Sequence, residues 1–259
     1  TSKKRAEQGA AAEALHELGI RLCGDVIFES IVDEEFGGSN GTIAGRLMGF
    51  NADAAVISEP TNLRICPAQR GGRIAHLTLR AIPNAGILSD GTYPQGVIPV
   101  LRAFLNAVPS FAERRRSTAP IHPLYAKHPD PVPVCVTKIN TGPWGNSEPQ
   151  LVPDTCQLEF FWQAMPGETR ENIDAEFFAW LNGITAERQA PPDVEFPIRW
   201  LPGSAIPTDA PLVVELQRTA GDVLRKTVPV VGMEGPADMF VFQQGFNIKQ
   251  ISQAWNAAQ

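Results

Sequence analysis

The chain has 259 residues, of which 43% are hydrophobic and 19% are charged, as in ordinary globular proteins. Its formal net charge of -6 and its pI near 5.3 argue against a nucleic-acid or anionic-membrane surface. No apolar run reaches transmembrane length, and the N-terminus does not read as a signal peptide, so we expect neither a nucleic-acid nor a membrane partner.

The cysteines show no C-x-x-C spacing of the kind found in zinc or redox motifs. We therefore expect reduced thiols that pack as small apolar residues, and a cytoplasmic location. The four positions are Cys23, Cys66, Cys135 and Cys156.

In chain order, a first helix is expected at 6–18, followed by two short apolar segments, 25–32 and 53–57, that read as strands. The residues between them, 42–48, read as a helix. A strand–helix–strand unit implies parallel strands whose C-terminal ends share one edge, and ligands bind at that edge in open α/β sheets. Both segments run directly into acids, which are Asp33, Glu34, Glu35 and Glu59.

The middle of the chain has the order β-α-β-β-α-β, which is typical of a ferredoxin-like split βαβ unit. Its expected strands are 73–80, 134–139, 156–161 and 194–200, and its expected helices are 97–108 and 169–181. A helix at 210–224 and a strand at 228–231 then return to α/β patterning. We therefore predict an α/β domain built from 1–71 and 204–259, into which the ferredoxin-like domain 72–203 is inserted.

Two motifs surround the acids: Asp33-Glu34-Glu35-x-Gly37-Gly38, and Ser58-Glu59-Pro60-Thr61. Together they resemble the family of acetylornithine deacetylase, succinyl-diaminopimelate desuccinylase, aminoacylase and glutamate carboxypeptidase (peptidase family M20). Members are co-catalytic zinc amidohydrolases and peptidases. The resemblance implies a parallel-rich sheet flanked by helices, with the ferredoxin-like insert acting as a lid that usually dimerises. Later matches follow in family order at 70–71, 152–156, 166–169 and 236–238.

The resemblance assigns the general base to Glu34 and zinc ligation to Glu35 and Glu59, in a site of two zinc ions where cobalt may substitute. Neighbouring carboxylates repel each other, and a divalent cation removes that repulsion. Asp33 sits at the bend, where we expect it to support the turn. The alternative is that all four acids form a solvated strand edge.

The sequence departs from the family pattern in its ligands. The family places a His-x-Asp pair and a bridging Asp before the first helix, and a further His after the last strand, and none of these is found here. None of the four histidines occupies a ligand position. Two hypotheses remain: the chain is a portion of a longer enzyme, or it is an inactive relative that serves as a dimerisation or binding module.

The expected substrate is a small molecule, an N-acyl amino acid or a dipeptide, and a homodimer through the lid is expected. Arg70 is a candidate for binding a substrate carboxylate, although a structural ion pair is an equal alternative. Asn140 is a candidate cleft residue, and Ser89 aligns with a family histidine that reaches the partner's site. Serine hydrolysis and nucleotide binding are disfavoured because neither Gly-x-Ser-x-Gly nor a P-loop lysine is present.

Overall fold

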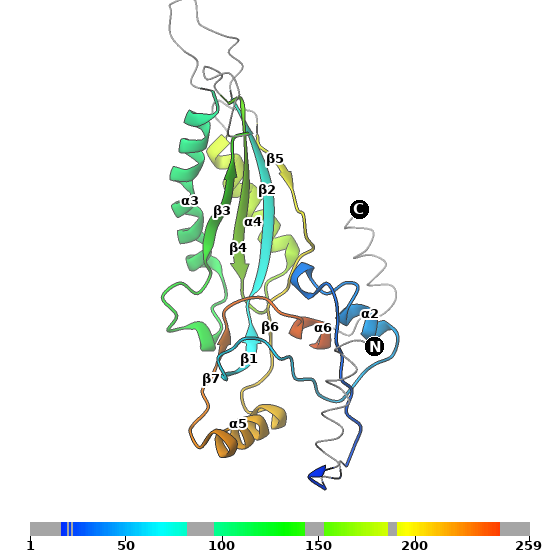
Figure 1. The fold of residues 1–259 in the computed structure, drawn as a ribbon. Helices are drawn as coiled ribbons and strands as arrows, with labels where there is room; N and C mark the ends of the chain where they lie inside the picture. Colours follow the sequence, from blue (N-terminus) through cyan, green and yellow to red (C-terminus); the bar gives the residue numbers. More distant parts are fainter. Residues whose placement is uncertain are drawn as a thin grey trace, which may run out of the picture.

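A computed structural model describes residues 17–19, 21, 23–81, 96–142, 153–185 and 191–243 (Figure 1). The expected helix at 6–18 lies outside them except for its last two positions. None of the described helices is long and apolar enough to cross a membrane. The elements are η1 (Glu34–Phe36), α2 (Thr42–Leu47), β1 (Ile65–Gln69), β2 (Gly71–Arg80), α3 (Ile98–Thr118), η2 (Pro123–Tyr125), β3 (Val134–Asn140), β4 (Thr155–Ala164), α4 (Arg170–Thr185), β5 (Asp193–Glu195), β6 (Ser204–Ala205), α5 (Pro211–Leu224), β7 (Val230–Met233) and α6 (Met239–Gln243).

The larger sheet has the strand order β3-β4-β2-β5, and all its pairs are antiparallel. Its first strand, β2, lies between the third and the fourth, which is the order of a ferredoxin-like unit, so that prediction is confirmed. Helix α4 begins after Thr169, whose hydroxyl accepts a hydrogen bond from the Asn172 N–H, as expected for an N-cap. Strand β5 is shorter than predicted, because Pro197 closely follows it and has no N–H to donate to a ladder.

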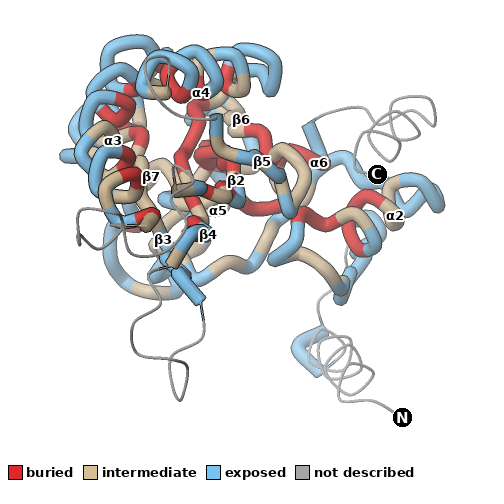
Figure 2. The backbone as a smooth tube through the Cα atoms, turned by 90° about the horizontal axis from the view of Figure 1, so that it is seen from above, coloured by how far each residue is buried: buried red, intermediate tan, exposed pale blue. Residues whose placement is uncertain are grey.

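An aromatic core joins this sheet to α3 and α4, which cover one of its faces. Figure 2 shows buried residues concentrated where these helices meet β2 and β4. The Trp162 and Phe177 rings stack at 4.6 Å between centroids, and Phe111 lies 4.9 Å from Trp180. Trp162 and Trp180 thus serve core packing.

The smaller sheet has the order β6-β1-β7, with β1 parallel to β7 and antiparallel to β6. Only Arg70 separates β1 from β2, so one run of chain passes from the small sheet into the large one. The buried Tyr125 hydroxyl lies 3.1 Å from the Ala68 carbonyl oxygen and 2.7 Å from that of Met233, and so fastens η2 to β1 and β7. The two sheets and their helices make a mixed α/β fold, as predicted.

The segments 25–32 and 53–57 are not strands, so the prediction of a parallel strand pair there is wrong. Neither joins a sheet among the described residues, and apolar side chains remain exposed: Val26 by 55%, Phe28 by 54% and Val56 by 62%. A strand needs a neighbouring strand for its backbone groups and a cover for its apolar face. Neither segment is paired with a strand among the described residues. The helix between them forms as expected, as α2.

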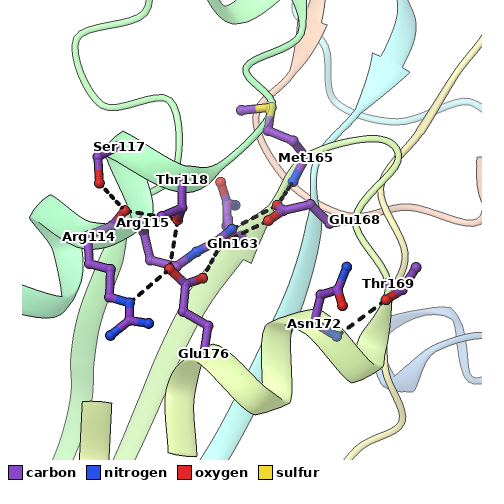
Figure 3. A network of polar contacts seen from close by, with 10 residues as sticks. All are labelled: Arg114, Arg115, Ser117, Thr118, Gln163, Met165, Glu168, Thr169, Asn172 and Glu176. Atoms are coloured by element: carbon purple, nitrogen blue, oxygen red, sulfur yellow. Dashed lines mark hydrogen bonds and ion pairs between the residues drawn. The ribbon is translucent and has the colours of Figure 1, made fainter. Parts of the chain in front are cut away.

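Arg115 is the centre of a buried ion-pair network that ties α3 to α4 and β4 (Figure 3). Its side chain is 1% exposed and donates to both oxygens of Glu168, at 2.8 and 2.7 Å, and to Glu176 at 2.6 Å. A further hydrogen bond of 3.2 Å reaches the Gln163 carbonyl. Glu168 also accepts from the Met165 N–H, so the network fixes the turn between β4 and α4.

Replacing Arg115 with Met should destabilise the fold strongly, by about 3–5 kcal/mol, because it leaves two carboxylates without their buried partner. Urea unfolding followed by circular dichroism measures this. Arg114→Met is the matched control: its side chain is 48% exposed, and its contact with Glu176 is 3.5 Å, so we expect a loss below about 1 kcal/mol. Equal losses in the two variants would contradict a special role for the buried network.

Candidate active site

The acidic motif forms a tight turn around η1. Asp33 precedes it with a left-handed backbone at φ 69°, and Gly37 and Gly38 follow at φ 97° and 68°. The Asp33 carbonyl accepts hydrogen bonds from the N–H groups of Phe36 and Gly38. Its carboxylate accepts from the Asn40 backbone at 3.2 Å and side chain at 3.1 Å. Asp33 therefore supports the turn, as expected.

A cavity of about 60 Å³ lies beside this turn. Three separate parts of the chain form its walls: the η1 turn, the linker that precedes β6, and the segment that follows β7. Two of the predicted site residues, Glu34 and Glu35, belong to its lining. The residues around it are Glu34, Glu35, Gly37, Leu201, Pro236, Ala237, Asp238 and Phe240.

The acids act on one another electrostatically at this place. Burial, together with the charges of Glu59, Asp238 and Glu35, raises the pKa of Glu34 to about 7. Burial also raises the pKa of Glu59, with further contributions from Glu35 and Asp238. The charges of Glu59, Glu34 and Glu35 thus act on one another, although the segment 53–57 before Glu59 is not a strand. Carboxyl groups that repel in this way hold protons near neutral pH or accept a cation.

Asp238 is the fourth acid, and it is the most buried, at 3% exposed. Burial raises its pKa, while the hydrogen bond from Thr42 and the charge of Arg199 oppose that shift. The Gln69 side chain holds both neighbours of Asp238: it donates to the Ala237 carbonyl at 2.6 Å and accepts from the Met239 N–H at 3.2 Å. The sequence placed Asp238 in a motif of the resembled family, and in the structure its carboxylate accepts a hydrogen bond from Thr42.

Gly38 explains why the turn and the Asp238 segment can touch. A Cβ atom at Gly38 would lie 2.5 Å from Asp238 Oδ1, and the backbone there has positive φ. Glycine is the residue that tolerates both conditions. The second glycine of the motif therefore serves close packing against Asp238.

Arg199 is a neighbour that sequence reasoning missed. It comes from the linker between β5 and β6, and its Nη1 donates to the Gly37 carbonyl at 3.3 Å. Its guanidinium carbon lies 5.1 Å from the centre of the Phe240 ring. A single arginine in an irregular linker carries no spacing signal, so only the folded chain reveals its place beside the acids.

Two other predicted site residues, Arg70 and Asn140, do not line this cavity. Arg70 is 3% exposed and donates to the carbonyls of Asp130 at 3.1 Å and Pro131 at 3.0 Å. Asn140, at the end of β3, accepts from the Gly142 N–H and lines a separate hollow of about 390 Å³ on the larger sheet. Ser89 lies outside the described residues.

Carboxylate oxygens suit a divalent metal ion, and a cation would remove the repulsion that raises the pKa values of these acids. The number of ligands that the described residues offer, however, is too small for a complete metal site. Within the described ranges, no three His, Cys, Asp or Glu side chains are placed to hold one metal ion. A catalytic zinc normally has three protein ligands, which the described residues do not bring together.

No protein-family model and no curated protein sequence matches the chain. Solved structures do match its fold. An M20 family metallo-carboxypeptidase from Sulfolobus solfataricus aligns with a TM-score of 0.55 at 11% identity, over 85% of this chain and 59% of its own. A tripeptidase from Staphylococcus aureus has a TM-score of 0.55 at 13% identity, over 89% and 56%. The dipeptidase Dug1p from Saccharomyces cerevisiae has a TM-score of 0.51 at 10% identity, over 70% and 46%.

These comparisons place the chain in the fold of M20 peptidases. At such low sequence identity they show the fold, and they do not identify the chain with a particular member of the family. The chain spans about half the length of these solved structures. The activity of the whole protein is therefore proposed below.

The stability of the metal-free chain should fall as pH rises between about 4.5 and 7. A carboxyl group whose pKa is raised on folding binds more protons folded than unfolded in this range, so each added pH unit favours unfolding. Glu34→Gln removes one such group, so its melting temperature should depend less on pH and exceed that of the parent chain at pH 7.5. Melting temperatures at pH 5, 6, 7 and 7.5 test this. A steeper pH dependence in the variant would contradict the raised pKa.

Proposed function

We propose that the chain belongs to a metal-dependent amide hydrolase that acts on N-acyl amino acids or small peptides, in the manner of acetylornithine deacetylase. The observation that supports this most is the pKa of about 7 for Glu34, held there by burial and by three neighbouring acids. A general base works best when its pKa lies near the working pH. The fold shared with M20 peptidases adds support for amide bonds as the target.

In this proposal Glu34 moves one proton. Its carboxylate takes the proton from the water that attacks the carbonyl carbon, so an O–H bond breaks while the new C–O bond forms. The same proton then passes to the amine nitrogen as the C–N bond breaks. The η1 turn suits the task, because Asp33 and Asn40 fix the backbone on either side of the two glutamates.

Zinc is the proposed metal, with two ions in the complete site and cobalt as a substitute. Glu35 and Glu59 would be two of its ligands, and further ligands would come from outside the described residues. When bound, the metal would supply a Lewis acid for the scissile carbonyl. No other step in the proposal depends on it.

A homodimer through the lid, and substrate contacts from Arg70, Asn140 and Ser89, remain proposals of the same kind. The second candidate function is a catalytically inactive dimerisation or binding module. The observation that favours it is the incomplete ligand set among the described residues. In that case the ferredoxin-like unit, with its well-packed core, would be the working part.

Glu34→Gln should lower kcat for amide hydrolysis by roughly 10²- to 10⁴-fold and leave KM nearly unchanged, because the base acts in the transition state. The measurement uses the protein in the full length in which it is encoded, loaded with Zn²⁺, on a panel of N-acetyl amino acids and dipeptides. The kcat/KM of the parent protein should rise with pH as the Glu34 carboxyl loses its proton. Chelation should abolish turnover, and Zn²⁺ or Co²⁺ should restore it.

Glu113→Gln is the matched control, since Glu113 lies exposed on α3 in the lid. It makes the same chemical change far from the cavity and should leave kcat unaltered. A metal-loaded parent protein that hydrolyses nothing on the panel would exclude the enzyme. Light scattering after size exclusion would then test the dimerisation module.

A further inference from the structure

Gln69 is a buried polar residue at the end of β1, and it is only 1% exposed. The small sheet does not need its side chain, because the residue is already in register with Ser204 on β6 and with Met233 on β7. Glutamine is mostly found on protein surfaces, since a buried carboxamide without hydrogen bonds costs free energy. The reason for a glutamine at this position therefore lies in the contacts of its side chain.

The carboxamide of Gln69 binds the backbone on both sides of Asp238. Its Nε2 donates to the Ala237 carbonyl at 2.6 Å, and its Oε1 accepts from the Met239 N–H at 3.2 Å. The same Nε2 lies 3.5 Å from the Pro202 carbonyl, in the linker that precedes β6. A carboxamide suits this double contact, because it carries a donor and an acceptor side by side. The side chain thus connects the segment after β7 with the linker before β6.

The segment held in this way carries Asp238 into the wall of the acidic cavity. The Asp238 carboxylate accepts a hydrogen bond from Thr42, and a Cβ atom at Gly38 would lie 2.5 Å from its Oδ1. Asp238 lines the cavity together with Glu34, and its charge contributes to the raised pKa of Glu34. Because the packing at Gly38 is so close, a small displacement of this segment would take the carboxylate away from both the turn and Thr42.

We propose that Gln69 is a positioning residue of the candidate active site, which fixes the place of the Asp238 carboxylate beside the turn that carries Glu34. For its part in catalysis this rests on the proposed function, because Glu34 is the base of the proposed amide hydrolysis. Gln69 does not itself line the cavity, so it acts through the backbone on either side of Asp238. The competing role is purely structural: Gln69 would satisfy two backbone groups, and the place of the Asp238 carboxylate would not depend on it.

A double-mutant cycle between Gln69 and Thr42 separates the two roles without turnover. Thr42 donates to the carboxylate of Asp238, whereas Gln69 binds the backbone beside it, so coupling between them has to pass through Asp238. Urea unfolding of the metal-free chain is followed by circular dichroism for the parent, Gln69→Met, Thr42→Val and the double variant. Thr42→Val should raise the unfolding equilibrium constant roughly 10- to 100-fold in the parent, the loss expected for a hydrogen bond to a charged group, and clearly less when Gln69 is replaced.

Thr137→Val is the matched control. Thr137 also donates to a carboxylate, that of Glu159, at 2.8 Å. Glu159 is in register with His76, which lies roughly 20 Å along the chain from Gln69 at the rise of a strand. The effect of Thr137→Val should therefore be the same with and without Gln69→Met. An equal effect of Thr42→Val in the two backgrounds would overturn the proposal and leave Gln69 with the structural role.

Turnover is the second readout, measured with the full-length, Zn²⁺-loaded protein on the panel of N-acetyl amino acids and dipeptides. Gln69→Met should lower kcat roughly 10- to 100-fold and leave KM nearly unchanged, because a misplaced wall beside the base acts on the transition state more than on binding. Gln69→Asn keeps the carboxamide on a side chain that is shorter by one methylene, so kcat should fall in this variant too. It replaces Gln69→Met in both experiments if that variant does not fold.

The two readouts separate this proposal from the proposed function. If the parent protein hydrolyses nothing, the proposed reaction fails, and the cycle alone decides whether Gln69 positions Asp238. In an active protein, a coupled cycle together with a lowered kcat supports the proposal. A coupled cycle with an unchanged kcat would overturn it, because the place of Asp238 would then have no part in the reaction.

Discussion

The packing of the Glu34 turn against the Asp238 segment is the contact on which the candidate site depends. Gly38 allows the approach, Thr42 donates a hydrogen bond to Asp238, and Gln69 holds the residues on either side of it. Gln69 ends β1, and only Arg70 lies between it and β2 of the larger sheet. The residue that holds the Asp238 segment therefore lies next to the junction of the two sheets.

The ferredoxin-like unit is stabilised in a different way from the candidate site. Its strands and helices follow from local patterns of apolar residues, and an aromatic cluster around Phe111, Phe160 and Trp162 fills its interior. Arg115, which is buried there, donates to two glutamates and a carbonyl. The ferredoxin-like unit thus has a hydrophobic core of its own. This explains why its order of elements could be predicted from the sequence alone.

The α/β part was predicted less well, and the reason lies in what its segments need. The apolar segment 25–32 has the composition of a strand, but strand formation depends on a neighbouring strand that sequence composition does not supply. Glu34 and Glu35 lie next to each other in the η1 turn, and the charge of Glu59 acts on Glu34 although no shared sheet edge joins their segments. Asp238 was noticed only as part of a motif and Arg199 was missed, because each reaches the cavity from a distant part of the chain. Contacts over such separations leave no periodic trace in a sequence.

Charge balance links these observations. Electrostatic repulsion acts among four carboxyl groups, those of Glu34, Glu35, Glu59 and Asp238. The positive charge of Arg199 acts on one of them, Asp238. One guanidinium cannot neutralise four acids, and burial makes the excess negative charge costly. A folded chain can relieve the excess by retaining protons, which the raised pKa of Glu34 expresses, or by binding cations. Arg199 offsets part of the excess, since its charge lowers the pKa of Asp238 while its Nη1 donates to the neutral carbonyl of Gly37.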